Sequence, residues 1–128
     1  MREIIFIAIG GSVGAVARFL VSKWVNLLSF STFPYGTLTV NIIGAGLIGF
    51  LFSFFNDLVL PAQYKSMITV GFLGAFTTFS TYSLESVNLF MAGEYRIGTL
   101  NILLNNVLSF GAVLAGIFVF RIIQNHIA

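Results

Sequence analysis

Charged residues are scarce and cysteine is absent: only 8% of the 128 residues are charged, and there is no Cys. The lack of Cys excludes disulfides, thiolate nucleophiles and thiolate metal sites. The formal net charge of +2 is small and scattered along the chain, so there is no basic patch and we expect no nucleic-acid partner. A soluble domain carries about 25% charged residues. This chain has too few to cover a water-facing surface, which indicates a membrane protein.

Hydrophobic residues make up 58% of the sequence and fall in four long segments. We expect membrane spans at about residues 4–28, 35–55, 67–91 and 97–123, because roughly 20 apolar residues cross a bilayer. The first segment contains Arg18 and Lys23 and has no small-residue cleavage pattern, so we interpret it as a retained span rather than a signal peptide. The predicted fold is an all-α membrane protein, with a single four-helix transmembrane domain over residues 1–128 in the cell inner or plasma membrane.

The sequence contains few side chains suited to catalysis. The single histidine, His126, follows the last predicted span, where we expect a solvated tail. Glu85 has no second carboxylate within the spans with which to share acid–base work, and we interpret it as a structural or vestibule residue. No cluster has metal-ligand spacing, and no Gly-rich phosphate loop is present. The sequence therefore predicts a protein that is not an enzyme.

The segment Gly71–Ser83 is unusually polar for a membrane span. Five of the seven residues from 77 to 83 are Ser or Thr, and Gly71 and Gly74 lie just upstream. Gly weakens a helix, while Ser and Thr can bond freed backbone groups. We therefore expect the third span to break between Gly71 and Thr77, where exposed carbonyls would attract a cation.

Two aromatic residues, Phe79 and Tyr82, follow the predicted break at a spacing of three and share one helical face. The edge of an aromatic ring is electropositive. An anion could therefore pass along their ring edges, although packing is the usual role of such side chains.

Polar residues also recur on single faces of the second and fourth spans. Thr37 and Asn41 share one face, and Asn101, Asn105 and Ser109 recur every four residues. Such stripes should face protein or water rather than lipid. Asn41 either makes an interhelical hydrogen bond or lines a polar path, where its NH₂ group could donate to an anion. Together these faces could line a path for a small ion with almost no fixed charge.

Arg18 lies well inside the first span, where an unpaired cation is costly. It either extends to the interface beside Lys23 and Trp24 or forms an electropositive vestibule for an anion. The nearby glycines, Gly10, Gly11 and Gly14, favour close packing of another helix.

Three motifs in three different spans resemble the Fluc (CrcB) fluoride channel family. In chain order they are Gly11-x-x-Gly14-Ala15-x-x-Arg18, Gly36-Thr37-Leu38-x-Val40-Asn41-x-x-Gly44 and Gly71-x-x-Gly74-x-x-Thr77-Thr78-Phe79-Ser80-Thr81. The resemblance implies a passive, fluoride-selective channel that exports toxic fluoride. It further implies an antiparallel, dual-topology homodimer with two pores, and one structural Na⁺ at the dimer centre.

The resemblance also implies roles for individual residues. The backbone carbonyls of Gly74 and Thr77 would hold the Na⁺. The pore or anion-binding candidates are Arg18, Asn41, Phe79, Ser80, Thr81, Tyr82, Asn105 and Ser109. This sequence departs from the family pattern at Tyr82, where Phe is common, and at Ala75, where Gly is frequent.

Two other functions remain open from the sequence. A small proton-coupled multidrug-type exporter would also have four spans, but it needs a carboxylate within the first span, and here only Glu3 lies at its edge. A non-transporting membrane scaffold would use its polar stripes only to bind a partner.

The distribution of Lys and Arg predicts dual topology. Of the basic residues, the side with the termini carries Arg2, Lys65 and Arg121, and the other side carries Lys23 and Arg96, with Arg18 if it extends that way. The two sides therefore carry three basic residues against two or three, which is almost no difference. An excess of Lys and Arg on one side normally fixes the orientation of a membrane protein. A reporter fused to the C-terminus is therefore expected on both faces of the membrane in one cell population. Finding it on a single face would contradict dual topology.

Overall fold

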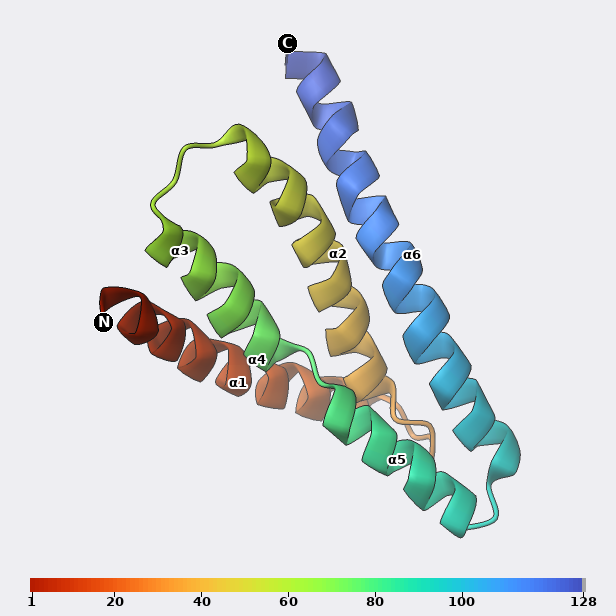
Figure 1. The fold of residues 1–128 in the computed structure, drawn as a ribbon. Coiled ribbons are helices and arrows are strands. Elements are labelled where there is room, and N and C mark those ends of the chain that lie inside the picture. Colours follow the sequence, from red (N-terminus) through yellow and green to blue (C-terminus); the bar gives the residue numbers. More distant parts are fainter. Residues whose placement is uncertain (128) are drawn as a thin grey trace.

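All the regular secondary structure in the part described by the computed structural model, residues 1–127, is helical (Figure 1). Its elements are α1 (Arg2–Leu28), α2 (Tyr35–Asp57), α3 (Ala62–Ser66), the π-helix η1 (Met67–Leu73), α4 (Gly74–Phe76), α5 (Phe79–Met91) and α6 (Tyr95–Ile127). Four stretches are long and apolar enough to cross a membrane: Arg2–Leu28, Tyr35–Asp57, Ala62–Met91 and Tyr95–Ile127. The predicted all-helical chain with four membrane-spanning helices is confirmed.

The third and fourth stretches each differ from the sequence prediction by more than two residues at one end. The third begins at Ala62 rather than near residue 67, because Pro61 directly precedes it with a φ of −55° and can start a helix. The fourth continues to Ile127, so His126 lies in the last turn of α6. Its side chain is exposed, as expected, with Nδ1 2.9 Å from the carbonyl oxygen of Ile122.

The third stretch is helical from Ala62 to Phe76 and again from Phe79 to Met91. The two residues between, Thr77 and Thr78, are extended, with ψ angles of 160° and 120°. We call them the Thr77–Thr78 link. The sequence placed the loss of helical conformation nearer the glycines, but Gly71 and Gly74 are both helical.

Several glycines instead allow neighbouring helices to approach closely. A Cβ on Gly71 would lie 2.6 Å from the carbonyl oxygen of Ile7 on α1. A Cβ on Gly14 would collide with the backbone of Phe72, and one on Gly49 would collide with the backbone of Val113. Small residues therefore hold α1 against η1 and α2 against α6 with their backbones nearly touching.

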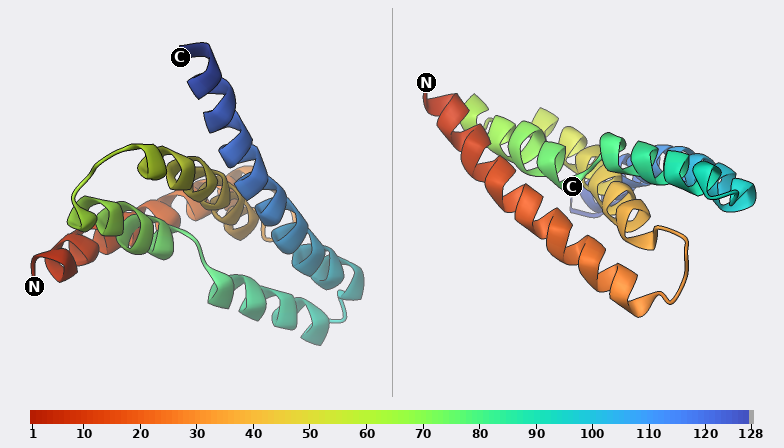
Figure 2. Two further views of the ribbon diagram at one scale, coloured as in Figure 1. Left: turned by 45° about the horizontal axis from the view of Figure 1, so that its top comes forward. Right: turned by 90° about the horizontal axis from the view of Figure 1, so that it is seen from below.

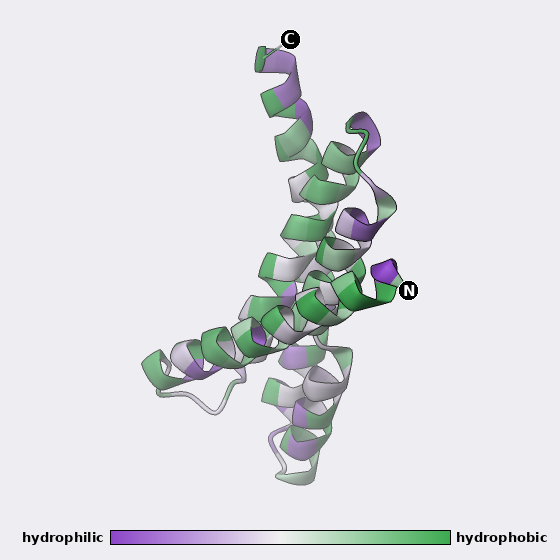
Figure 3. Cartoon of the chain, turned by 90° about the vertical axis from the view of Figure 1, so that its left-hand side faces the viewer, coloured by the Kyte–Doolittle hydropathy of each residue, from purple (hydrophilic) through white to green (hydrophobic). Residues whose placement is uncertain are grey.

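The helices form an open arrangement rather than a closed bundle. In Figure 2, α5 leads away from α3 and α4, and α6 carries the C-terminus away from the N-terminus. Hydrophobic residues run along most of each helix, and many hydrophilic ones lie near the chain ends and connections (Figure 3). Large apolar side chains such as Phe19, Trp24 and Phe110 are exposed on the single chain. Lipid or another protein surface must cover these faces.

Candidate functional site

The Thr77–Thr78 link is the centre of the candidate site. Thr78 caps the following helix: the backbone N–H of Thr81 donates to Thr78 Oγ1 at 3.2 Å. The two hydroxyl oxygens of Thr78 and Thr81 lie 3.0 Å apart. A Thr in an extended conformation followed by this bond is a typical helix start. The local sequence thus explains why α5 begins at Phe79.

Asn41 on α2 pairs with both backbone polar groups of Thr78. The N–H of Thr78 donates to Asn41 Oδ1 at 2.8 Å, and Asn41 Nδ2 donates to the carbonyl oxygen of Thr78 at 3.1 Å. A backbone N–H can only donate and a carbonyl can only accept, so these contacts fix the orientation of the amide. Asn41 therefore supplies the hydrogen bonds that helical neighbours would otherwise give to Thr78. We call this pairing the Asn41 clasp.

A line of side chains continues from the clasp across α6 to α5. Asn41 Nδ2 donates to Asn105 Oδ1 at 2.8 Å, and Asn105 Nδ2 donates to Asn101 Oδ1 at 2.8 Å. Asn101 Nδ2 donates to Ser86 Oγ at 2.9 Å, and the Ser86 hydroxyl donates to the carbonyl oxygen of Tyr82 at 2.8 Å. We call Asn41, Asn105, Asn101 and Ser86 the amide relay. Every donor points the same way, from α2 towards α5.

Three of the four members of the amide relay, Ser86, Asn101 and Asn105, are buried, and Asn41 is half-buried. The members hydrogen-bond to one another. Asn101 is 0% exposed and Asn105 is 5% exposed. The expectation that the stripe on the fourth span faces protein is confirmed for both. Of the two roles open for Asn41, the interhelical hydrogen bond is present, and both N–H groups of its amide already have acceptors in this conformation. Its role in lining a pore stays a prediction.

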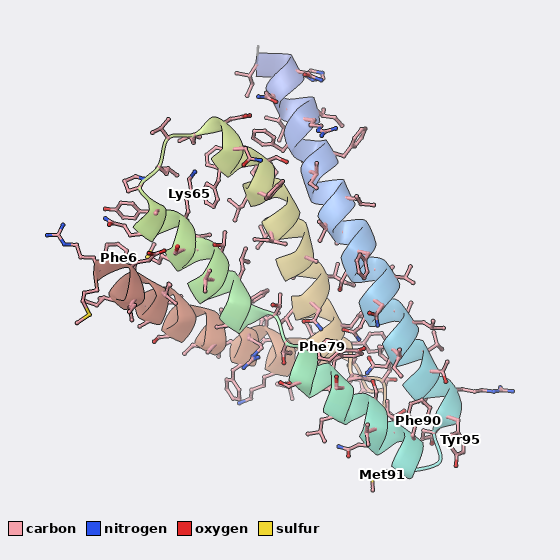
Figure 4. The ribbon with its side chains drawn as sticks, viewed as in Figure 1. Phe6, Lys65, Phe79, Phe90, Met91 and Tyr95 are labelled. Carbon is pink, nitrogen blue, oxygen red and sulfur yellow. The ribbon has the colours of Figure 1, made fainter. Side chains whose placement is uncertain are left out.

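The aromatic pair lies directly after the link. Phe79 and Tyr82 pack with ring centroids 5.1 Å apart and planes at 77°, an edge-to-face geometry. Phe79 is 75% exposed at the start of α5 (Figure 4), whereas Tyr82 is buried. The Tyr82 hydroxyl accepts a hydrogen bond from Asn106 Nδ2 at 3.2 Å. Periodicity in the sequence does not point to Asn106, because it falls one position outside the regular spacing of the polar stripe.

Arg18 reaches the link from α1. Its Nη1 donates to the carbonyl oxygen of Thr77 at 3.5 Å, at the long end of a hydrogen bond. The sequence left open whether Arg18 extends to the interface or lines a vestibule. In the structure the guanidinium is partly buried and points to the start of the link.

Glu85 connects α5 to α2 through a second polar contact. The Thr37 hydroxyl donates to Glu85 Oε1 at 2.7 Å, and Thr37 is buried. Glu85 Oε2 is also buried and has no hydrogen-bond partner among residues 1–127. Of the two roles expected for Glu85, structural or vestibule, this contact agrees with the structural one.

A cavity of about 480 Å³ opens beside the link. It brings together seven of the residues expected at the ion site: Asn41, Gly74, Thr77, Phe79, Tyr82, Asn105 and Ser109. Three others do not line it. Ser80 and Thr81 are exposed on the first turn of α5, and Arg18 approaches the link from α1.

The clasp generates a test of its own. Asn41→Leu keeps similar bulk but leaves the buried N–H and C=O of Thr78 unpaired, at a cost of about 1–3 kcal/mol for each group. We expect a marked fall in the midpoint of thermal or detergent-driven unfolding of the purified protein. Asn88→Leu on the exposed face of α5 is the matched control and should leave that midpoint nearly unchanged. Equal stability of the two variants would contradict the clasp.

Comparisons with known proteins identify the family of this chain. The chain matches the family described as CrcB-like protein, Camphor Resistance (CrcB), over residues 5–117. A relative from a Nitratiruptor species, named Fluoride-specific ion channel FluC, is 45% identical over 115 residues, 90% of this chain and 89% of the relative. Relatives of the same name from Vibrio parahaemolyticus and Photobacterium profundum are 47% and 48% identical over 112 residues, covering 87% of this chain and 88% of each relative. The chain therefore belongs to the CrcB-like protein family.

Proposed function

We propose that this protein is a fluoride-selective ion channel, not an enzyme, and that it conducts fluoride passively across the cell inner membrane. Two relatives named Fluoride-specific ion channel FluC align with 90% and 87% of this chain. The structural observation that carries the proposal is the cavity beside the Thr77–Thr78 link, where hydroxyls, amides and aromatic rings meet without a carboxylate or an ammonium group. Such a lining suits a small anion that must enter and leave.

The chemistry of the cavity explains how an anion could shed its water. Neutral hydroxyl donors replace hydration, and they bind less tightly than fixed charges, so the ion can move on. Phe79 and Tyr82 add electropositive ring edges. Arg18 contributes a positive potential near the link, which raises the local anion concentration. Fluoride gains most from such close donors because its charge is concentrated on a small ion.

The link would then lie within the bilayer, making the third span a broken membrane helix. Extended backbone at membrane depth is tolerated only where protein or a water-filled path satisfies its polar groups. The Asn41 clasp does this for Thr78, and Arg18 does it in part for Thr77.

The working unit is proposed to be an antiparallel homodimer with two pores. One chain leaves large apolar side chains and the cavity uncovered, which is unfavourable unless a second copy or lipid covers them. The balance of Lys and Arg between the two sides favours insertion in both orientations. The cavity of each copy would be completed by its partner.

The carbonyl groups of Gly74 and Thr77 are proposed to hold a structural Na⁺. The N–H groups that would bond them in a continuous helix are engaged elsewhere: Thr78 donates to Asn41, and Thr81 donates to the Thr78 hydroxyl. Carbonyl oxygens are suitable ligands for an alkali cation, and the Thr77 oxygen keeps a lone pair beside its long contact with Arg18. Two oxygens are too few for a full shell, so two copies would have to share the ion.

The proton-coupled exporter is the weaker alternative. The only carboxylate on α1, Glu3, lies at its exposed start and accepts a hydrogen bond from Ser66. A carboxylate in the first turn of α1 lies at the end of the span, whereas proton coupling needs a carboxylate at membrane depth.

Ion flux from liposomes containing the purified protein tests the function. We expect rapid fluoride efflux, no measurable chloride efflux, and no dependence on a proton gradient. Phe79→Ile removes the ring edge at the cavity while keeping an apolar side chain, so it should slow fluoride efflux by at least tenfold with the dimer still assembled.

Phe19→Ile is the matched control, because Phe19 is an exposed phenylalanine on α1 outside the cavity. It should conduct like the unmodified protein. Proton-coupled cation export would favour the exporter, and absence of any flux would favour a scaffold. Unaltered flux in Phe79→Ile would remove the ring edge from the mechanism.

A further inference from the structure

Ser109 presents a hydroxyl with no hydrogen-bond partner in the described part of the chain. Its Oγ is buried, and the residue lines the cavity beside the link. Several other Ser and Thr hydroxyls on these helices donate to the carbonyl four residues earlier, as Ser86 does to Tyr82 and Thr69 does to Lys65. Ser109 does not, so its proton is available to a ligand in the cavity.

Tyr82 carries a second uncommitted hydroxyl proton in the same cavity. Its oxygen accepts from Asn106 Nδ2 at 3.2 Å, and the same nitrogen donates to the carbonyl oxygen of Ile102 at 2.8 Å. A carbonyl cannot donate, so the contact with Ile102 requires the NH₂ group at that position of the Asn106 amide. The Tyr82 oxygen must therefore act as an acceptor towards Asn106. Its own proton has no acceptor within residues 1–127.

We infer that the Tyr82 and Ser109 hydroxyls form a two-donor subsite for a small anion, and that Asn106 is its positioning residue. The inference rests on the proposed channel function and names fluoride as the ion. It gives Tyr82 a direct hydrogen bond to the ion in addition to its ring edge. Asn106 orients the Tyr82 hydroxyl and does not itself contact the ion.

The chemistry of the three side chains fits this arrangement. Hydrogen bonds to an ion are about twice as strong as those between neutral groups, and two neutral donors add no charge that would trap the ion. Donation by Asn106 to the phenol oxygen polarises the O–H bond and strengthens it as a donor. The same bond holds the oxygen on the α6 side and leaves the proton to turn elsewhere. Asn106, Ser109 and Tyr82 all line the one cavity.

Fluoride affinity is the quantity to measure, because flux alone can rise or fall when binding weakens. We would record fluoride current in planar bilayers against fluoride concentration and take the half-saturating concentration. Tyr82→Phe keeps the ring and removes only the hydroxyl. We expect the half-saturating concentration to rise roughly tenfold, the ratio for losing one hydrogen bond to a charged group. Ser109→Ala should have a similar effect.

Tyr95→Phe is the matched control, since Tyr95 is exposed at the start of α6 and does not line the cavity. It should leave the half-saturating concentration unchanged. An unchanged value in Tyr82→Phe as well would overturn the subsite. So would a Tyr82→Phe variant that loses only thermal stability or dimer assembly, because the proton would then bond a group of the second copy.

Asn106→Leu separates positioning from packing. In the unmodified protein it should raise the half-saturating concentration several-fold, because the phenol loses its orientation. In the Tyr82→Phe background it should produce no further rise, since no hydroxyl remains to position. An equal rise in both backgrounds would overturn the positioning role.

The failure of this inference and of the proposed function are distinguishable. If the unmodified protein passes no fluoride, the channel function fails. If the unmodified protein conducts fluoride and Tyr82→Phe has the same half-saturating concentration, the channel function holds and only the subsite fails.

Discussion

The pairing of Asn41 with both polar groups of the Thr78 backbone is the interaction on which the site depends. An apolar helix that loses its internal hydrogen bonds must find other partners, because lipid offers none. A single amide side chain supplies a donor and an acceptor in the arrangement of a peptide group, at 3.1 Å and 2.8 Å. With Thr78 held in this way, the chain can leave α4 and restart at Phe79 without an unpaired group on that residue.

The amide relay extends this constraint from α2 through α6 to α5. Because each amide orients the next, Asn41 is coupled to Ser86 and hence to the backbone of Tyr82. The rings at the cavity are thus positioned by polar contacts from three helices. A channel lining needs hydrogen-bond donors for the ion. It also needs other donors that hold the helices together, and the two sets must be different. The amides serve structure, and the hydroxyls of Tyr82 and Ser109 remain.

Much of this could be predicted from the sequence, and the limits have physical causes. Four spans follow from long apolar segments, and the buried stripe follows from Asn101 and Asn105 at a spacing of four. The role of Gly71 could not be predicted, because a glycine that lets a neighbouring backbone approach looks the same in sequence as one that weakens a helix. The clasp joins residues 37 positions apart, and no local pattern encodes which amide pairs with which peptide. Asn106 was missed because its partner, the Tyr82 hydroxyl, lies on another helix.

The central claim is that the Thr78 backbone is held by a side chain rather than by solvent, and amide hydrogen exchange measures this directly. In the unmodified protein, resolved residue by residue by NMR in nanodiscs, the N–H of Thr78 should exchange as slowly as the amides in the middle of α2. We expect this protection although Thr78 lies in an extended link, because its N–H donates to Asn41 Oδ1. Exchange as fast as that of the loop between α1 and α2 would show that water reaches Thr78 and would contradict the account.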